Sequence, residues 1–568
     1  MTAFGIDFGT TNSAVAVFSN DEVEVIRIDS PPMEWEQFGY DRVFPSVFGY
    51  GDNREPLFGW AAKLAETETK IEAVKRLFAT EDHVTIGEEQ FLVDEVATML
   101  FAQIKRSAAT ESGQDMNRAV VTIPANSRGR ARQRTKLCAG MGGIEVLWLM
   151  NEPTAAAVAA TRRHREDQSV MVIDWGGGTL DVTVLEVLEG TFMEHTSSGI
   201  QRCGGVDFDS AIMKWLAEST PGSEEWTRIQ RSILRSEVEK AKMLLSNQDE
   251  ANIPLPNGDV RRLTRAEFDQ ITQYIVDQVK IPLERCLRDL SGLSGTVDCL
   301  VLAGGTCKVP AVRALVENVV GMAPMSGLDP LTAIAEGAAL VSAIMQGELP
   351  DSGFFPATEH TLGTVVLNPA TQTLGFSPII PRGRKLPASG TETYVPVVDD
   401  QEYLEFSVIE GDHEKPLSDD GNVILAESNL EIPNPGPMDE ITFSFTYRYD
   451  LDGIVLFDVV DLRDQSSLHS GEIALGVQRD RQQMVDIAKR VETTLNEGEV
   501  QESEVVSDLD PEVAALVLDT RTKVAPFVED DEAVEIREIC QQIESSGGSD
   551  QSLVDRLQAI KQKYNYLF

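Results

Sequence analysis

The sequence predicts a multidomain protein in which a long α/β domain comes first, an all-β domain follows, and a small α-helical domain ends the chain. Residues 1 to about 347 alternate short β-rich runs with helix-like stretches, a pattern typical of α/β domains. From His360 to about Val477, apolar and polar residues alternate in short runs separated by turns, and the remainder is acidic with helical periodicity. A chain of 568 residues is too long for one hydrophobic core, so we expect three or four domains.

Two strand–helix pairs illustrate the α/β character of the first domain. A predicted strand, Ala119–Ile123, is ended by a proline and followed by the helix-like stretch Arg128–Met141. Another predicted strand, Cys299–Leu302, leads to Gly304-Gly305 and then to the helix-like stretch Ala311–Val320. A short strand, a turn and a helix in this order favour a sheet covered by helices.

The second domain is predicted from alternating apolar runs. Residues 348–357 carry two prolines and a glycine and are predicted to be a linker. Beyond it, Glu405–Ile409 and Ile441–Tyr447 alternate as half-buried strands do, and we expect turns at Glu410-Gly411 and Asp452-Gly453. These features predict a β-sandwich.

The C-terminal segment is predicted to be helical. Leu553, Leu557 and Ile560 are spaced i, i+4, i+7 and so share one helix face, after a flexible joint at Ser545–Ser549. The expected boundaries are 1–347 for the α/β domain, 348–357 for the linker, 358–477 for the β-sandwich and 478–568 for the helical, lid-like domain.

Composition excludes several classes of protein. No apolar run approaches the roughly 20 residues needed to span a bilayer, and the N-terminus does not resemble a signal peptide. Six scattered cysteines without a CxxC pair indicate reduced thiols in the cytoplasm. The formal charge of −43 argues against binding to nucleic acid. It indicates either a solvated acidic surface or a salt-adapted host.

A glycine-rich loop occurs twice. Gly5–Asn12 and Val172–Asp181 each contain an apolar run, an aspartate, glycines and a hydroxyl residue, and each is followed by a second β-rich run. This order predicts two β-hairpins whose tips offer backbone N–H groups to an anion. Two such tips from related half-domains can hold one polyphosphate between them. The aspartates, Asp7 and Asp174, are placed to hold a metal ion through water.

Three further segments fit a nucleotide site, although the sequence has no G-x-x-x-x-G-K-[ST] loop. Gly304-Gly305-Thr306 lies between a strand and a helix, where the backbone can approach a ligand. Glu239, Lys242 and Ser246 are spaced i, i+3, i+7 on one helix face. In the third segment, the Glu152 carboxylate precedes a helix that begins at or after Pro153.

Together these motifs resemble the DnaK-type heat-shock chaperone family, and the short length and the tail resemble its HscC branch most. The resemblance covers nearly the whole chain and is weakest in the linker and the tail. Its segments are Gly5–Asn12, Val74–Leu77, Ile123–Ala125, Asn151–Ala157, Ile173–Asp181, Cys203–Gly205, Glu239–Ser246, Gly304–Pro310, Phe376–Arg382 and Tyr449–Ile454.

The resemblance implies an actin-like ATPase domain of two related lobes, a β-sandwich that binds peptides and an α-helical lid. It implies ATP and ADP with Mg²⁺ as cofactors, with Asp7 and Asp174 holding Mg²⁺ through its waters. Lys75 and Glu152 resemble the residues that position the attacking water. Pro124 and Arg132 resemble a proline switch and an arginine relay between the nucleotide and the substrate domain. The implied phosphate and adenosine contacts are Gly9, Thr10, Thr11, Asn12, Gly176, Gly177, Gly178, Thr179, Gly204, Gly205, Glu239, Lys242, Ser246, Gly304, Gly305, Thr306 and Lys308.

The family binds extended apolar segments of unfolded polypeptides in its β domain. The residues in matching positions are Leu362, Val366, Leu367, Phe376, Ile379, Val423 and Leu425. The resemblance also implies a nucleotide-exchange factor and leaves partnership with a J-domain co-chaperone open, because Trp148 stands where an arginine usually pairs with the partner's aspartate.

Other positions depart from the family pattern. Asn126-Ser127 replaces an aromatic pair after the switch proline, and the linker lacks the usual leucine-rich acidic run. Leu331 replaces an acid, and Lys308 replaces an arginine that stacks near adenine. We therefore expect hydrolysis with altered coupling between the domains.

Two other classes of protein share parts of the pattern. One is a regulatory protein of the same family that holds ATP and a partner but hydrolyses little ATP. The other comprises sugar kinases and actin-like filament proteins, which have the nucleotide fold but do not need a β domain and a helical tail after residue 358.

Overall fold

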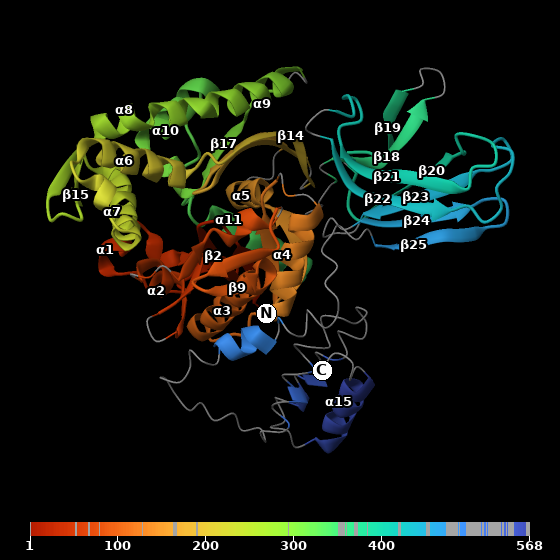
Figure 1. Ribbon diagram of the computed structural model, residues 1–568, viewed down its shortest axis with the longest axis horizontal. Helices are drawn as coiled ribbons and strands as arrows, with labels where there is room; N and C mark the ends of the chain where they lie inside the picture. The colour runs from red at the N-terminus through yellow and green to blue at the C-terminus, as the bar shows by residue number, and fades with distance from the viewer. Residues whose placement is uncertain are drawn as a thin grey trace.

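The computed structural model has two lobes and a separate β-sandwich (Figure 1). It describes residues 2–51, 54–65, 67, 69–78, 80–125, 127, 129–162, 167–188, 191–292, 295–349, 358, 360–368, 373–382, 384–418, 422–449, 455–472, 487, 489–495, 513, 516–517, 520, 536, 539–540, 542–543 and 550–563.

Lobe I is built on a sheet of order β11-β10-β1-β2-β3, with β4 also paired to β2. Its outer face is covered by α3 and α4, and a large apolar cluster fills the space between. The elements are β1 (Ala3–Asp7), β2 (Asn12–Ser19), β3 (Glu22–Ile26), α1 (Met33–Glu36), the 3₁₀ helix η1 (Tyr40–Arg42), β4 (Phe44–Pro45), β5 (Val47–Tyr50), β6 (Pro56–Phe58), α2 (Gly59–Leu64), β7 (Lys70–Glu72), the 3₁₀ helix η2 (Val74–Leu77), β8 (His83–Ile86), β9 (Glu89–Leu92), α3 (Val93–Ser112), β10 (Arg118–Ile123), α4 (Gly129–Met141) and β11 (Glu145–Asn151).

Lobe II is built on a sheet of order β14-β13-β12-β17, in which β12 runs parallel to β17 and antiparallel to β13. Helices α6 to α10 cover one face of it. The elements are β12 (Gln168–Trp175), β13 (Thr179–Leu188), β14 (Thr191–Gln201), α6 (Gly205–Ser219), η3 (Ser223–Glu225), α7 (Arg228–Asn247), β15 (Glu250–Pro254), β16 (Val260–Thr264), α8 (Arg265–Val276), η4 (Asp277–Val279), α9 (Lys280–Gly292), β17 (Cys299–Ala303), η5 (Gly305–Lys308) and α10 (Pro310–Val320).

Two alanine-rich helices, α5 (Glu152–Thr161) and α11 (Ala333–Met345), join the lobes. They pack on each other and share one apolar cluster with strands of both sheets. Small side chains permit this close contact: a Cβ on Gly337 would collide with the Ala155 carbonyl. The two sheets are therefore joined through one helix pair, with both hairpin tips at the same cleft.

The β domain is a sandwich of two four-stranded antiparallel sheets, β19-β18-β21-β22 and β20-β23-β24-β25. Aromatic and aliphatic residues of both sheets form its core. The guanidinium of Arg382 contacts lobe II, donating to the Glu194 carbonyl at 2.7 Å and also to the His195 carbonyl. The strands are β18 (Thr361–Asn368), β19 (Thr373–Ile380), β20 (Ala388–Tyr394), β21 (Tyr403–Gly411), β22 (Val423–Glu431), β23 (Phe443–Tyr449), β24 (Val455–Asp461) and β25 (Ser466–Glu472).

Among the described residues, the C-terminal segment has helical residues in two separate apolar clusters. Ile487, Val491 and Leu495 pack into the lobe I cluster, and the Arg490 Nε lies 2.9 Å from the buried carboxylate of Glu95. Separately, α15 (Gln551–Lys563) contributes to a second, smaller apolar cluster. Leu557 and Ile560 are buried in this cluster and Leu553 packs against it, as the i, i+4, i+7 spacing predicted.

Two sequence expectations were wrong in detail. Glu410-Gly411 is not a turn but the end of β21, where Gly411 pairs with Thr361; a strand glycine here permits close pairing. The helix α5 begins at Glu152 and not after it. The predicted turn at Asp452-Gly453, the joint at Ser545–Ser549 and linker residues 350–357 lie outside the described residues.

In the part of the chain that the structure describes, no helix has the length and apolar character required to cross a bilayer.

Candidate functional site

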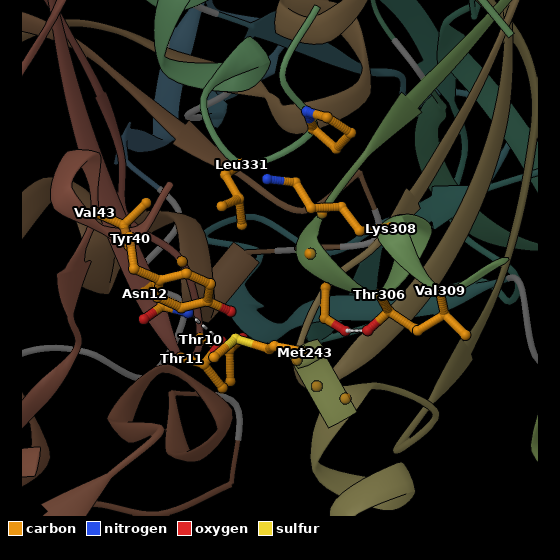
Figure 2. Close-up of a pocket in the computed structure, with 18 of the residues that line it drawn as sticks. Thr10, Thr11, Asn12, Tyr40, Val43, Met243, Thr306, Lys308, Val309 and Leu331 are labelled. Carbon is orange, nitrogen blue, oxygen red and sulfur yellow. Dashed lines mark hydrogen bonds between the residues drawn. The ribbon is translucent and has the colours of Figure 1, made fainter. Parts of the chain in front are cut away.

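A pocket of about 480 Å³ lies between the two lobes, where the hairpins β1–β2 and β12–β13 end. In Figure 2, Thr10, Thr11 and Asn12 of lobe I lie across it from Thr306 and Lys308 of lobe II. The pocket brings together most of the predicted nucleotide-site residues. These are Asp7, Gly9, Thr10, Thr11, Asn12, Pro124, Glu152, Asp174, Gly176, Gly177, Gly178, Thr179, Gly205, Glu239, Lys242, Ser246, Gly304, Gly305, Thr306 and Lys308.

Lobe I holds the first hairpin tip by donating hydrogen bonds to the carbonyl groups of that tip. The hydroxyl of Ser46 donates to the Gly9 carbonyl at 2.9 Å, and the Ser46 amide donates to the Thr11 carbonyl at 2.9 Å. The Lys75 ammonium donates to the Phe8 carbonyl. A Cβ on Gly9 would collide with the Asn12 carbonyl, so the tight turn needs glycine at this position.

The second tip is held in the same way by lobe II. The carbonyl of Gly176 accepts from the Gly205 amide at 3.1 Å and from the Thr306 hydroxyl at 2.8 Å. The carbonyl of Gly177 accepts from the Val206 amide at 2.9 Å. The segments containing Gly205 and Thr306 therefore support the second tip from behind.

The tips also meet across the cleft. A Cβ on Gly177 would come within 2.5 Å of the Thr11 side chain, and the Arg76 guanidinium of lobe I donates to the Gly178 carbonyl at 2.9 Å. Gly204 does not line the pocket, but its Cα packs so closely on Gly177 that any side chain there would collide with it.

Lys75 and Glu152 form a buried ion pair beside the tips. The Lys75 Nζ lies 2.7 Å from the Glu152 Oε1, and the two side chains are 7% and 10% exposed. Lys75 comes from η2 of lobe I, whereas Glu152 is the first residue of α5. The pair therefore connects a lobe I segment to the helix between the two sheets.

Asp7 and Asp174 place two further carboxyl groups in the same part of the pocket. Burial raises the pKa of Asp7 to about 7; the Glu152 carboxylate adds to this rise, while the Lys75 ammonium and a hydrogen bond from Thr122 oppose it. Burial, with the carboxylates of Glu152, Asp181 and Asp7, also raises the pKa of Asp174 well above its usual range. A group of buried carboxylates whose charged forms are disfavoured is a suitable environment for a cation.

Pro124 and Arg132 are connected through hydrogen bonds. The Ser127 amide donates to the Pro124 carbonyl at 2.9 Å, and the Arg132 Nε donates to the Ser127 carbonyl at 3.1 Å. The Arg132 Nη2 donates to the Asn151 Oδ1 at 2.9 Å, and Asn151 precedes Glu152. Arg132 is 8% exposed, so it lies inside the lobe and links the proline turn to the start of α5.

The other end of the pocket is lined by α7. The Lys242 Nζ lies 2.7 Å from the Asp209 carboxylate and donates to the Gly205 carbonyl at 3.0 Å. The Glu239 carboxylate lies 2.8 Å from the Lys63 Nζ of lobe I. Burial opposes ionisation of Glu239, but Lys63 and Lys242 hold its pKa below the usual value.

The positions that depart from the family pattern have packing or pairing roles. Trp148 is 6% exposed and packs in the core between the two sheets, so it is not a surface residue at this position. The Lys308 Nζ lies 2.9 Å from the Asp329 carboxylate. Leu331 lies beside Gly305 in the pocket wall.

Arg134 is a further residue that the sequence reasoning missed. It is fully buried, and its Nε lies 2.9 Å from the equally buried Asp94 carboxylate. Its Nη1 donates to the Phe78 carbonyl at 2.9 Å and to the Glu81 carbonyl at 2.5 Å, directly after the η2 segment that carries Lys75. An arginine in a helix usually faces solvent, and nothing in the local pattern marked this one as buried.

The pocket also includes residues of lobe I that were not predicted, namely Gln37, Phe38, Tyr40 and Val43. They come from a segment without helical or strand periodicity. Two aromatic residues in this segment, Trp35 and Tyr40, are the sequence feature that could have indicated a packed part of the site.

The predicted peptide-binding residues divide between core and surface. Leu362 and Ile379 are 1% and 5% exposed and pack in the sandwich core, as Leu425 does in part. Val366 and Leu367 are consecutive in β18, so their side chains lie on opposite faces of the sheet.

Part of the outer face of this sheet is apolar, although β21 and β22 also place Glu405, Glu427 and Asn429 on that face. Phe376 pairs with Val365, and Leu367 pairs with Leu374, so these four side chains share the face opposite the core. Val423 is half-buried in β22, and its neighbour Ile424, on the outer face, is 49% exposed.

Comparison with known proteins agrees with this architecture. The model of the family described as Hsp70 protein matches residues 3–83 and 79–567. The chain is 33% identical over 515 residues to chaperone protein DnaK of Thermosipho africanus (strain TCF52B), covering 86% of this chain and 83% of that protein. It is 28% identical over 557 residues to chaperone protein DnaK of Mycoplasmopsis agalactiae (strain NCTC 10123 / CIP 59.7 / PG2), covering 93% and 90%. The chain therefore belongs to the Hsp70 family and is an ATP-dependent molecular chaperone with ATPase activity.

Proposed function

We propose that the interlobe pocket binds ATP with Mg²⁺ and hydrolyses it, and that nucleotide binding controls the affinity of the β domain for apolar polypeptide segments. The observation that carries this proposal is the Lys75–Glu152 pair. Glu152 lines the pocket with the two glycine-rich tips and two buried aspartates. Lys75 is not part of the lining itself, but it pairs with Glu152 and donates to the Phe8 carbonyl beside the first tip. The closer affiliation with the HscC branch stays a prediction.

Phosphate binding follows from the way both tips are anchored. Their carbonyl groups accept hydrogen bonds from supporting segments on the protein side. A polyphosphate in the pocket then meets amide groups and the hydroxyls of Thr10, Thr11 and Thr179. Two tips from two lobes suit the β- and γ-phosphates of one nucleotide.

The residues present fit Mg²⁺. Carboxylate oxygens are the donors this ion prefers, and it usually retains several water molecules. The described residues contain no group of three or more His, Cys, Asp or Glu placed to hold a metal directly. Asp7 and Asp174 would therefore hold Mg²⁺ through its waters, and the ion would supply positive charge against the phosphates.

Hydrolysis of ATP needs charge neutralisation and an ordered water more than covalent chemistry. Lys75 can neutralise charge on the terminal phosphate, and Glu152 can accept a hydrogen bond from the attacking water. Their present ion pair fixes both side chains beside the tips. At the other end of the pocket, Glu239, Lys242, Ser246, Gly304, Gly305 and Lys308 are placed to contact the nucleoside.

Polypeptide binding is proposed for the outer face of the β19-β18-β21-β22 sheet. Leu367 and Phe376 share this face with the exposed Ile424. Half-exposed apolar side chains on a sheet suit an extended apolar segment. The buried Leu362 and Ile379 support this face from within the core.

Three groups of contacts support coupling between the domains. The Pro124–Arg132 connection runs toward Glu152, and the Arg382 guanidinium joins the sandwich to β14. Ile487, Val491 and Leu495 pack on lobe I. We propose that nucleotide binding moves the lobes and thereby changes these contacts. Co-chaperones that act on this step and a cytoplasmic location are part of the same proposal.

Single-turnover hydrolysis of ATP tests the catalytic assignment. Lys75→Ala should slow hydrolysis about 10²-fold or more while ATP still binds, because the lysine acts on charge at the reacting phosphate. Lys214→Ala, at a lysine that is 77% exposed on α6, is the matched control and should hydrolyse ATP at the wild-type rate. Equal rates for Lys75→Ala and wild type would reject the assignment.

A further inference from the structure

A segment of lobe I lines the pocket and also contacts lobe II. Residues 33–42, which we call the cleft strap, comprise α1, a turn at Gly39 and η1 between β3 and β4. Gly39 has φ of +80°, a conformation that favours glycine, and the turn brings the chain back toward lobe I. The strap therefore has a defined path.

Aromatic packing attaches the strap to lobe I. The ring of Trp35 is fully buried and lies 5.0 Å from the ring of Trp60 on α2 and 5.8 Å from that of Tyr40. The Lys63 ammonium lies 4.9 Å from the Trp35 ring centre. Such contacts hold the strap in one place on its own lobe.

Ion pairs join the strap to lobe II at both of its ends. At one end, the Glu34 carboxylate lies 2.6 Å from the Lys240 Nζ on α7. At the other, the Arg42 guanidinium lies 3.5 Å from the Asp329 carboxylate, which also pairs with Lys308. The strap thus bridges the two lobes on either side of the pocket.

Between these ends the strap lines the pocket with Gln37, Phe38 and Tyr40. Figure 2 shows the Tyr40 ring on the lobe I side, with Val43 beside it and Met243 and Leu331 close to the same end of the pocket. The Tyr40 hydroxyl would lie 3.7 Å from a Cβ on Gly305 of lobe II. Apart from the polar Gln37, the lobe I side of this wall is aromatic and aliphatic, which suits a nucleobase and ribose more than a phosphate.

We propose that the cleft strap binds the nucleoside end of the nucleotide from lobe I, through Tyr40, and slows nucleotide release through its ion pairs to lobe II. The proposal rests on the proposed function, since it requires a nucleotide in this pocket. The strap's neighbours in lobe II, Gly305 and Lys308, belong to the nucleoside end, whereas Lys75 and Glu152 lie at the phosphate end.

The ion pairs are suited to a contact that opens and closes. Glu34 and Arg42 have side chains that are 56% and 42% exposed, so each pair is weak and is screened by salt. The strap can then release one lobe without unfolding, because the aromatic contacts within lobe I stay in place.

The first test compares two ligands. Affinities for ATP and for inorganic tripolyphosphate, both with Mg²⁺, are measured by calorimetry on wild type, Tyr40→Phe and Tyr40→Ala. Tyr40→Ala should weaken ATP binding about tenfold or more and leave tripolyphosphate binding within about twofold, since tripolyphosphate has no nucleoside. Tyr40→Phe keeps the ring and should retain most of the ATP affinity.

The second test avoids the aromatic core. Release of ADP is timed after addition of excess ATP for Glu34→Gln combined with Arg42→Gln. Release should be about two- to tenfold faster than in wild type and less sensitive to salt. Glu36→Gln, also exposed on α1, is the control and should release ADP at the wild-type rate.

The outcomes separate the two proposals. Wild-type protein that binds no ATP would overturn the proposed function and the strap with it. Wild-type binding of ATP, with Tyr40→Ala unchanged in ATP affinity and the double variant unchanged in ADP release, would overturn the strap alone. Equal weakening of ATP and tripolyphosphate by Tyr40→Ala would also overturn it, because the residue would then act on the whole pocket.

Discussion

The Lys75 Nζ and the Glu152 Oε1 lie 2.7 Å apart, one on a 3₁₀ turn of lobe I and the other at the start of the helix between the sheets. The pair is almost fully buried, so each charge depends on the other. A relative displacement of η2 and α5 would break it. This makes the pair sensitive both to bound phosphate and to the arrangement of the lobes.

The first prediction concerns Glu152. Glu152→Gln keeps the size and a hydrogen-bonding oxygen but removes the negative charge that orders water. We expect ATP to bind and its hydrolysis to slow about 10²- to 10³-fold in single-turnover measurements. Glu186→Gln in lobe II is the control, since Glu186 pairs with His195 away from the pocket. Hydrolysis within threefold of wild type in Glu152→Gln would contradict the assigned role.

The second prediction concerns Arg134. Replacing it by alanine leaves the Asp94 carboxylate buried opposite an empty site, so we expect a loss of about 3–5 kcal/mol in the free energy of unfolding. Arg134→Lys restores the positive charge but lacks the second guanidinium nitrogen, which donates to the Phe78 and Glu81 carbonyls. This variant should therefore recover only part of the lost stability. Denaturant unfolding measures both, with Arg118→Lys on the surface as control. A loss below about 1 kcal/mol for Arg134→Ala would be incompatible with this packing.

The third prediction is a pH dependence. Burial raises the pKa of Asp7 from 3.8 to about 7. Between pH 3.8 and 7, the nucleotide-free native state therefore keeps a proton on Asp7 that the unfolded state has lost. Its stabilising effect is complete below pH 4 and is lost as the pH rises through 7. Asp7→Asn should therefore match wild type near pH 4 and become more stable by on the order of 4 kcal/mol at pH 8. Unfolding curves at several pH values check this, and a constant difference would refute it.

The fourth prediction separates the core of the sandwich from its surface. Ile424→Ser should weaken binding of an apolar peptide severalfold and change stability little, because this side chain is 49% exposed. Leu362→Ala should cost about 2–5 kcal/mol of stability through the cavity it leaves. Peptide titration and unfolding are measured on both variants. Unchanged peptide affinity in Ile424→Ser would place the binding face elsewhere.

The parts of the site that could be predicted from the sequence are those specified locally. Each hairpin tip has its aspartate, glycines and hydroxyl residue within a few positions, and both tips are found at the pocket. The strand and helix over 118–141 were likewise predicted to within a residue or so at their ends.

The parts that could not be predicted depend on distant partners. The cleft strap is fixed by Trp60 and by charges on Lys240 and Asp329, which are far away in sequence. Arg134 lies in a helix whose pattern gives no sign that α3 supplies a buried aspartate. At Gly411, strand pairing with Thr361 outweighed the local preference of glycine for a turn.

In the function we propose, ATP in the cleft controls polypeptide binding by the sandwich. Dissociation of a labelled apolar peptide, timed with and without ATP in wild type and Arg132→Ala, tests it most directly. We predict that ATP speeds peptide release at least tenfold in wild type and that Arg132→Ala, which still binds ATP, loses most of this effect. Peptide release at the same rate with and without ATP in the wild-type protein would contradict the claim.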